Sequence, residues 1–166
     1  MPMKLGTERP NLSGATEWIN LEGNQEILSE LHGSAHPYLV HFWSVSCYLC
    51  KDRMPRIQEL AHLYKDKGLK IIAIHMPRQE QDTDMELVRS TITSLGIKEP
   101  CAIDNSHLLK DAFLNEQGWV PAYYLFDADG KLKARAAGEV GLSIVENALT
   151  KLFPTAISTT SDTTAN

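Results

Sequence analysis

Buried strands and amphipathic helices alternate along the sequence. The apolar runs at residues 38–43 and 70–74 are typical of strands covered on both faces of a sheet. Between them, apolar side chains recur at helical spacing over residues 47–67, and Gly68 indicates where that helix ends. Pro55 lies inside this helix and should kink it. The pattern therefore predicts a strand–helix–strand unit.

The same alternation extends over the rest of the chain. Before the first buried strand, we expect a short strand at residues 16–20, a weak helix at 25–31 and a loop at 33–37. After residue 74 we predict a solvated charged loop at 78–84, a helix at 85–95, a strand at 101–103, a helix at 106–115, strands at 122–126 and 131–137 joined by a turn at 127–130, and a helix at 143–153. The fold class is α/β, with a central β-sheet flanked by helices on both faces. The final hairpin adds antiparallel strands to the parallel ones, so we expect a mixed sheet.

A chain of 166 residues has the size of one domain. We predict an N-terminal extension at residues 1–14, a single domain at 15–153 and a disordered tail at 154–166, because the last segment is rich in Ser and Thr and has little to bury.

Charge and hydropathy narrow the range of partners. The 16 basic and 21 acidic residues give a formal charge of -5, which argues against nucleic acid and anionic membranes. The first ten residues have no apolar segment typical of an export signal, and no run is apolar enough to span a bilayer. We therefore expect a cytoplasmic protein, although a mature exported form would have the same sequence features.

Two of the three cysteines are spaced for redox chemistry. Cys47 and Cys50 lie one turn apart at the start of the long predicted helix, close enough for a disulfide. The positive end of the helix favours a thiolate on Cys47, which makes Cys47 the expected nucleophile and Cys50 the resolving thiol. Cys101 stands alone and is expected to be a buried apolar residue.

A cysteine pair of this spacing also occurs in half of a zinc site and in haem attachment. The sequence contains no second pair of cysteines or histidines at metal-ligand spacing. Lys51 follows Cys50 where covalent haem attachment requires His. We therefore expect no metal site and no covalently attached haem.

Positions around the cysteine pair resemble the thioredoxin superfamily. The dipeptide Phe42-Trp43 precedes the first cysteine, Pro55 follows it in the helix, and Val120-Pro121 stands before the strand at residues 122–126. In the superfamily a cis-proline faces the cysteine pair, and Pro121 occupies the matching position.

The chain resembles one branch of this superfamily more closely. About 45 residues separate the second buried strand from Pro121, which is enough for an extra helix and strand like the insertion of TlpA and ResA proteins. The segments HFWSVSC at 41–47, IHMPR at 74–78 and VPAYY at 120–124 resemble the small YkuV-type thiol-disulfide oxidoreductases. The resemblance extends over residues 18–153.

The resemblance implies a thioredoxin fold with a TlpA-like insertion before the cis-proline. It also implies a reductase of protein disulfides that uses no cofactor and is re-reduced by an upstream thiol donor. The backbone of Val120 would pair with the substrate, and the exposed aromatic residues Tyr48 and Trp119 could form an apolar rim for it. Trp43 would either pack beneath the cysteines or contact substrate. The candidate site residues are, for catalysis, Cys47, Cys50 and His41, and, for substrate binding, Trp43, Tyr48, Val120 and Pro121.

His41 has two interpretations. It occupies the position at which thioredoxins keep a buried Asp, so it could accept the proton of Cys50. The alternative is a buried neutral histidine satisfied by a backbone carbonyl. His75, at the end of the second buried strand, is expected to be a packed core residue.

The sequence departs from its relatives at three places. Ser46 replaces the Trp that usually precedes the first cysteine, and it could cap the helix instead. Tyr48-Leu49 replaces the Gly-Pro of thioredoxin, so the reduction potential cannot be transferred. Arg53 stands where ResA-like proteins have Glu.

Two other functions compete with a protein-disulfide reductase. A thiol peroxidase would share the fold, but Val40 replaces the Pro of the usual peroxidase motif. A non-catalytic binding module would keep the fold and use its cysteine pair only as a structural link.

Overall fold

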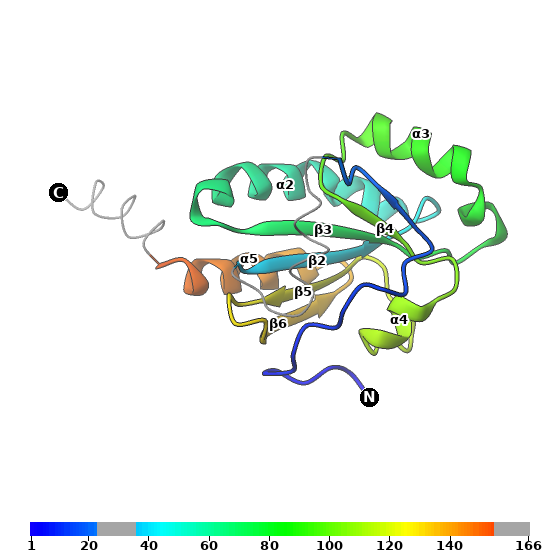
Figure 1. Ribbon diagram of the computed structural model, residues 1–166. Helices are drawn as coiled ribbons and strands as arrows, with labels where there is room; N and C mark the ends of the chain where they lie inside the picture. The colour runs from blue at the N-terminus through cyan, green and yellow to red at the C-terminus, as the bar shows by residue number, and fades with distance from the viewer. Residues whose placement is uncertain (23–35, 155–166) are drawn as a thin grey trace.

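The computed structural model describes residues 1–22 and 36–154. The predicted helix at 25–31 and the tail beyond residue 154 lie outside the described residues, as does most of the loop at 33–37. In the described part, the strands form a six-stranded sheet in the order β1-β4-β3-β2-β5-β6 (Figure 1). The strands are β1 (Glu17–Ile19), β2 (Tyr38–Trp43), β3 (Lys70–His75), β4 (Cys101–Ile103), β5 (Ala122–Phe126) and β6 (Leu132–Ala137).

The sheet is mixed, as the sequence predicts. Strands β2, β3 and β4 run parallel, whereas β5 is antiparallel to β2 and β6 is antiparallel to β5. Strand β1 is also antiparallel, next to β4. The central strand β2 is buried over its whole length, because it has a neighbour on each side and core packing on both faces.

Helices cover both faces of the sheet (Figure 1). The described α-helices are α2 (Tyr48–Tyr64), α3 (Met85–Leu95), α4 (Leu108–Ala112) and α5 (Gly141–Leu152), and short 3-10 turns lie at η2 (Lys65–Lys67) and η3 (Glu80–Thr83). Apolar side chains of α2, α3 and α5 pack with Trp43 and the cysteine pair in one core. The other core contains α4 and N-terminal residues such as Leu12. No helix of the described residues is long and apolar enough to cross a bilayer.

Most predicted elements are confirmed. Helix α2 runs through Pro55, and Gly68 ends η2 with a φ of 90°, which a glycine adopts without steric cost. Helix α3 has the predicted bounds, since Asp84 caps its start and Gly96 ends it. The insertion supplies α3 and β4, as the resemblance to TlpA and ResA implies.

Two predicted helices differ in extent. The helix expected at 106–115 is only α4, because His107 has a positive φ of 62° at its start and Leu114 has one of 54° after its end. Helix α5 begins at Gly141, before the predicted residue 143.

The N-terminal residues pair with the outer sheet edge. Backbone hydrogen bonds join Gly6, Thr7 and Arg9 to the turn and first residue of β6, and an antiparallel bridge joins Glu8 to Lys131. Further along β6, Lys133 and Arg135 are exposed.

Candidate active site around Cys47 and Cys50

Cys47 and Cys50 form a disulfide at the start of α2. Their Cα atoms are 5.3 Å apart. Cys47 is the N-cap residue, and its Sγ accepts a hydrogen bond of 3.1 Å from the backbone N–H of Cys50. Both cysteines are nearly buried, at 4% and 2% exposure. The same N–H and the positive end of the helix would stabilise a thiolate on Cys47 after reduction.

Val120 and Pro121 are joined by a cis peptide bond, as the resemblance to thioredoxins implies. Val120 is half-buried and packs against both cores. The side chain of Asn115 holds the preceding loop, because it exchanges two hydrogen bonds of 3.0 Å with the backbone of Trp119. On the other side, the carbonyl of Pro121 accepts a hydrogen bond of 2.9 Å from the N–H of Gly138. The proline loop is thus fixed at both ends.

Asp82 fixes Ser46, the residue that precedes Cys47. Its carboxylate is fully buried and accepts hydrogen bonds from the backbone N–H of Ser46 at 3.0 Å and from the Ser46 hydroxyl at 2.7 Å. It also accepts from the backbone N–H groups of Arg78 at 2.9 Å and Gln79 at 3.1 Å. Burial opposes ionisation of Asp82, but these four donors outweigh it, and the pKa of Asp82 lies below its usual value.

These contacts correct two sequence predictions. Ser46 does not cap α2, because Cys47 does so and the Ser46 hydroxyl is bound to Asp82. The segment at 78–84 is not simply a solvated loop, since it contains η3 and buries Asp82.

Trp43 and His75 form the floor of the site. Their rings meet edge to face with centroids 4.8 Å apart, and both side chains are fully buried. Trp43 is packed in the core, and its indole has no exposed surface in this oxidised state. Nε2 of His75 accepts a hydrogen bond of 3.2 Å from the N–H of Val45. Burial lowers the pKa of His75 to about 4, so the ring is neutral at pH 7. His75 is the packed histidine that the sequence predicts.

His41 is paired with a carboxylate. Its Nε2 lies 2.6 Å from Oε2 of Glu99, and Oε1 of Glu99 accepts a hydrogen bond of 2.9 Å from Gln58 of α2. Burial opposes ionisation of Glu99, but the hydrogen bond and charge of His41 outweigh it and lower the pKa of Glu99. Among the described residues, no contact within hydrogen-bond distance joins His41 to Cys50.

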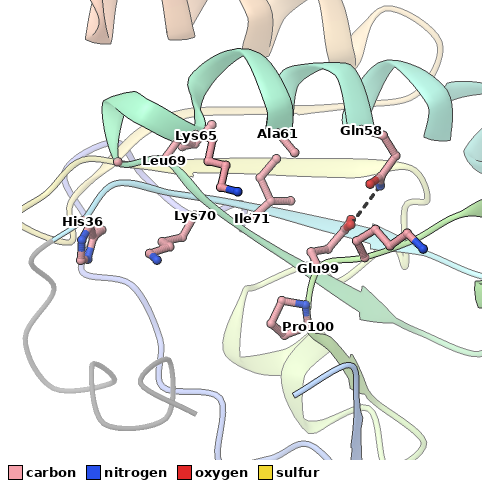
Figure 2. Close-up of a pocket in the computed structure, with 11 residues that line it drawn as sticks. His36, Gln58, Ala61, Lys65, Leu69, Lys70, Ile71, Glu99 and Pro100 are labelled. Carbon is pink, nitrogen blue, oxygen red and sulfur yellow. Dashed lines mark hydrogen bonds between the residues drawn. The ribbon is translucent and has the colours of Figure 1, made fainter. Parts of the chain in front are cut away.

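Figure 2 shows the pocket that Glu99 lines and the hydrogen bond between Gln58 and Glu99. Glu99 lines a pocket of about 410 Å³ between the second half of α2, the start of β3 and the segment before β4. Gln58 reaches toward Glu99 from the helix, and Lys65 lies further along the wall. The pocket lies at the end of α2 opposite to the cysteines, so it is separate from the disulfide.

Tyr48 and Trp119 are the exposed aromatic residues of the site. Tyr48, between the two cysteines, is 83% exposed, and Trp119, next to Val120, is 55% exposed. Cys101 is fully buried, and burial raises the pKa of its thiol to about 12. It is the buried apolar residue that the sequence predicts. Within residues 1–22 and 36–154, no three His, Cys, Asp or Glu side chains lie together as metal ligands would.

The sequence profile of the AhpC/TSA family matches residues 5–135, which is more than half of the chain. The chain belongs to the AhpC/TSA family. Among its relatives, the thiol-disulfide oxidoreductase YkuV of Bacillus subtilis is 41% identical over 151 residues, which cover 91% of this chain and 97% of YkuV. The thiol-disulfide oxidoreductase ResA of Bacillus anthracis is 32% identical over 152 residues, or 92% of this chain and 80% of ResA.

A solved structure supports the fold of this AhpC/TSA family member. The solution structure of a thioredoxin-like protein in the oxidized form superposes with a TM-score of 0.76 and 39% identity, covering 90% of this chain and 97% of that one. The fold class and the resemblance to YkuV and ResA are therefore confirmed.

The sequence does not reveal the roles of three residues of the site. Asp82 lies in a charged run that resembles an ordinary loop, and Glu99 stands beside Pro100 before a short strand. Arg78 ends the segment IHMPR, which carries a family resemblance but does not indicate what this side chain does. Each acquires its role through a partner distant in the sequence, such as Ser46 for Asp82 and His41 for Glu99. Sequence reasoning therefore misses them.

Proposed function

We propose that this protein is a thiol-disulfide oxidoreductase that reduces disulfide bonds in proteins. The observation that carries the proposal is the Cys47–Cys50 disulfide at the helix start, in a thioredoxin fold that also contains the cis Val120–Pro121 bond. The relatives YkuV and ResA, both named thiol-disulfide oxidoreductases, support it.

The reaction starts from the reduced cysteine pair. The Cys47 thiolate attacks one sulfur of the substrate disulfide, the substrate S–S bond breaks, and the leaving thiolate takes up a proton. Cys50 then loses its proton and attacks Sγ of Cys47, which releases the second substrate thiol. The substrate has gained two electrons and two protons, and the protein is left with the Cys47–Cys50 disulfide. An upstream dithiol donor returns it to the reduced form.

The surroundings of the cysteines provide substrate contacts. The backbone of Val120 is the candidate for pairing with an extended substrate segment next to its disulfide. Tyr48 lies between the two cysteines and Trp119 next to Val120, and the exposed apolar surface of both rings supports contact with unfolded chains.

His41 is the proposed proton acceptor for Cys50, and this role stays a prediction. The ring lies on the sheet face that α2 covers, but the contact of its Nε2 is with Glu99. If the pair takes the proton, His41→Leu and Glu99→Gln both change the pH dependence of thiol exchange. An unchanged profile in His41→Leu would leave His41 with a packing role only.

Insulin reduction with an external thiol donor tests the function. We expect Cys47→Ser to lose activity and Cys50→Ser to accumulate a mixed disulfide between Cys47 and the substrate, detected by mass spectrometry. Cys101→Ser is the matched control, because its thiol is buried, and it should remain active. An active Cys47→Ser protein would refute the proposal.

The binding-module alternative predicts a cysteine pair that does not exchange with glutathione or thioredoxin. A measured reduction potential of the Cys47/Cys50 pair separates a reductase from an oxidant: about -270 mV supports a reductase, and about -120 mV an oxidant. The cytoplasmic location expected from the sequence stays a prediction.

A further inference from the structure

Arg78 lies beside the proposed nucleophile, where the parallel strands β2 and β3 end. It follows β3, and Ser44 and Ser46 follow β2; because these strands are parallel, both loops emerge at the same end of the sheet. Nε of Arg78 donates to the hydroxyl of Ser44 at 3.2 Å, and Nη2 donates to the hydroxyl of Ser46 at 3.4 Å. Since Ser46 immediately precedes Cys47, the guanidinium is held next to the reactive residue.

The hydroxyl of Ser46 is oriented to accept this hydrogen bond. It donates its own hydrogen to Oδ2 of the buried Asp82 at 2.7 Å, so its lone pairs are left for Arg78. The backbone N–H of Arg78 is bound to the same carboxylate oxygen at 2.9 Å. The main chain of Arg78 is thus bound directly to Asp82, and its side chain is linked to the same carboxylate through the Ser46 hydroxyl.

The Arg78 guanidinium is exposed, and only some of its N–H donors form hydrogen bonds. Arg53, Arg56 and Arg89 each form an ion pair with a carboxylate. By contrast, no carboxylate of residues 1–22 and 36–154 lies within 4.0 Å of the Arg78 guanidinium. Two N–H groups are engaged with serine hydroxyls, and the Nη1 edge has no acceptor among the same residues. A guanidinium edge of this kind binds a carboxylate through two parallel hydrogen bonds.

We propose that Arg78 is a specificity-determining residue that selects substrates with an Asp or Glu beside the target disulfide. The inference rests on the proposed function and names its substrate class, disulfides in acidic segments. The net charge of the chain is -5, so the preference does not come from long-range attraction of anions. It comes from contact of one substrate carboxylate with the Arg78 guanidinium.

Disulfide-bonded peptides that differ only in the residue beside the cysteine test the inference, with Glu, Gln or Lys at that position. Because the contact is exposed, we expect wild-type kcat/KM to be roughly two- to fivefold higher for the Glu peptide than for the Gln peptide at low salt, and lowest for Lys. Raising the ionic strength should reduce the difference.

Substitutions of Arg78 test whether its guanidinium causes the preference for the Glu peptide. Arg78→Gln should remove the preference through KM, so that the Glu and Gln peptides are reduced with equal kcat/KM. Arg78→Lys keeps the charge without the planar fork and should retain part of the preference. Arg89→Gln, which removes one exposed positive charge on α3, is the control and should keep the full preference.

Two results would overturn the inference. The first is a wild-type protein that reduces the Glu and Gln peptides equally well. The second is an Arg78→Gln protein that loses the same factor on all peptides, which would mean that the cation acts on the Cys47 thiolate and not on the substrate.

A binding measurement keeps this test independent of the proposed function. The Cys47→Ala, Cys50→Ala protein should bind the Glu peptide more tightly than the Gln peptide, and equal affinities would count against the inference. If the preference in binding is present but wild type reduces none of the peptides, the proposed function fails while the inference stands.

Discussion

Nε2 of His41 lies 2.6 Å from Oε2 of Glu99, although the two residues are 58 positions apart and both side chains are almost fully buried. One partner comes from the central strand β2 and the other from the segment before β4. The pair therefore joins the insertion to the centre of the sheet, beneath the helix that carries the cysteines.

Removing one partner of this pair should destabilise the protein strongly. Glu99→Ala leaves the buried His41 without its partner, and we expect a loss of about 3–5 kcal/mol in the free energy of unfolding, measured with urea. His41→Leu should have a similar cost. The double variant His41→Leu, Glu99→Leu should lose less than the sum of the single variants, and additive losses would show that the two side chains are not coupled.

Asp82 should be important for stability despite its place in a polar segment. Asp82→Ala leaves four partly buried donors without their acceptor, and we expect a loss of about 2–4 kcal/mol together with slower alkylation of Cys47, since Ser46 is released. The control is Glu80→Ala on the same 3-10 turn, which is exposed and should change stability by less than about 0.5 kcal/mol. Equal effects of the two substitutions would refute the anchoring role.

His75 should make stability depend on pH. Its pKa is about 4 in the folded protein, whereas an ordinary solvated histidine has a pKa of 6.5, so the unfolded chain binds the proton first as pH falls. Stability is therefore lost between about pH 6.5 and pH 4, by roughly 3 kcal/mol at the lower limit. Urea unfolding at pH 7 and pH 4.5 should show a smaller difference for His75→Gln than for wild type. His62→Gln, an exposed histidine on α2, is the control, and the same difference in all three proteins would contradict the prediction.

Cys101 should be inert in the folded protein. Its thiol is fully buried and has a pKa raised to about 12, so the reactive thiolate is scarce at pH 8. After reduction, iodoacetamide should label two cysteines in native protein and three in urea, as counted by mass spectrometry. Labelling of Cys101 before unfolding would show that this core opens readily.

Elements with local signals can be predicted from the sequence. Helix α3 has an Asp at its start and a Gly at its end, and residues 71–74 of strand β3 are an uninterrupted apolar run. Spacing and resemblance identify the cysteine pair and Pro121. The short extent of α4 has no such signal, because it depends on the positive φ angles of His107 and Leu114. The contacts of Asp82, Glu99 and Arg78 also escape prediction, since each arises from tertiary packing and not from neighbours in the sequence.

The pairing of the N-terminal residues with β6 has a consequence for self-association. An edge strand exposes unpaired backbone groups that can template the addition of a strand from another chain. Here Gly6, Thr7 and Arg9 occupy the first part of that edge, the exposed Lys133 and Arg135 lie along the rest, and the opposite edge is the three-residue strand β1. Both edges of the sheet are thus unfavourable for the addition of a strand from another chain, and so for aggregation through the sheet.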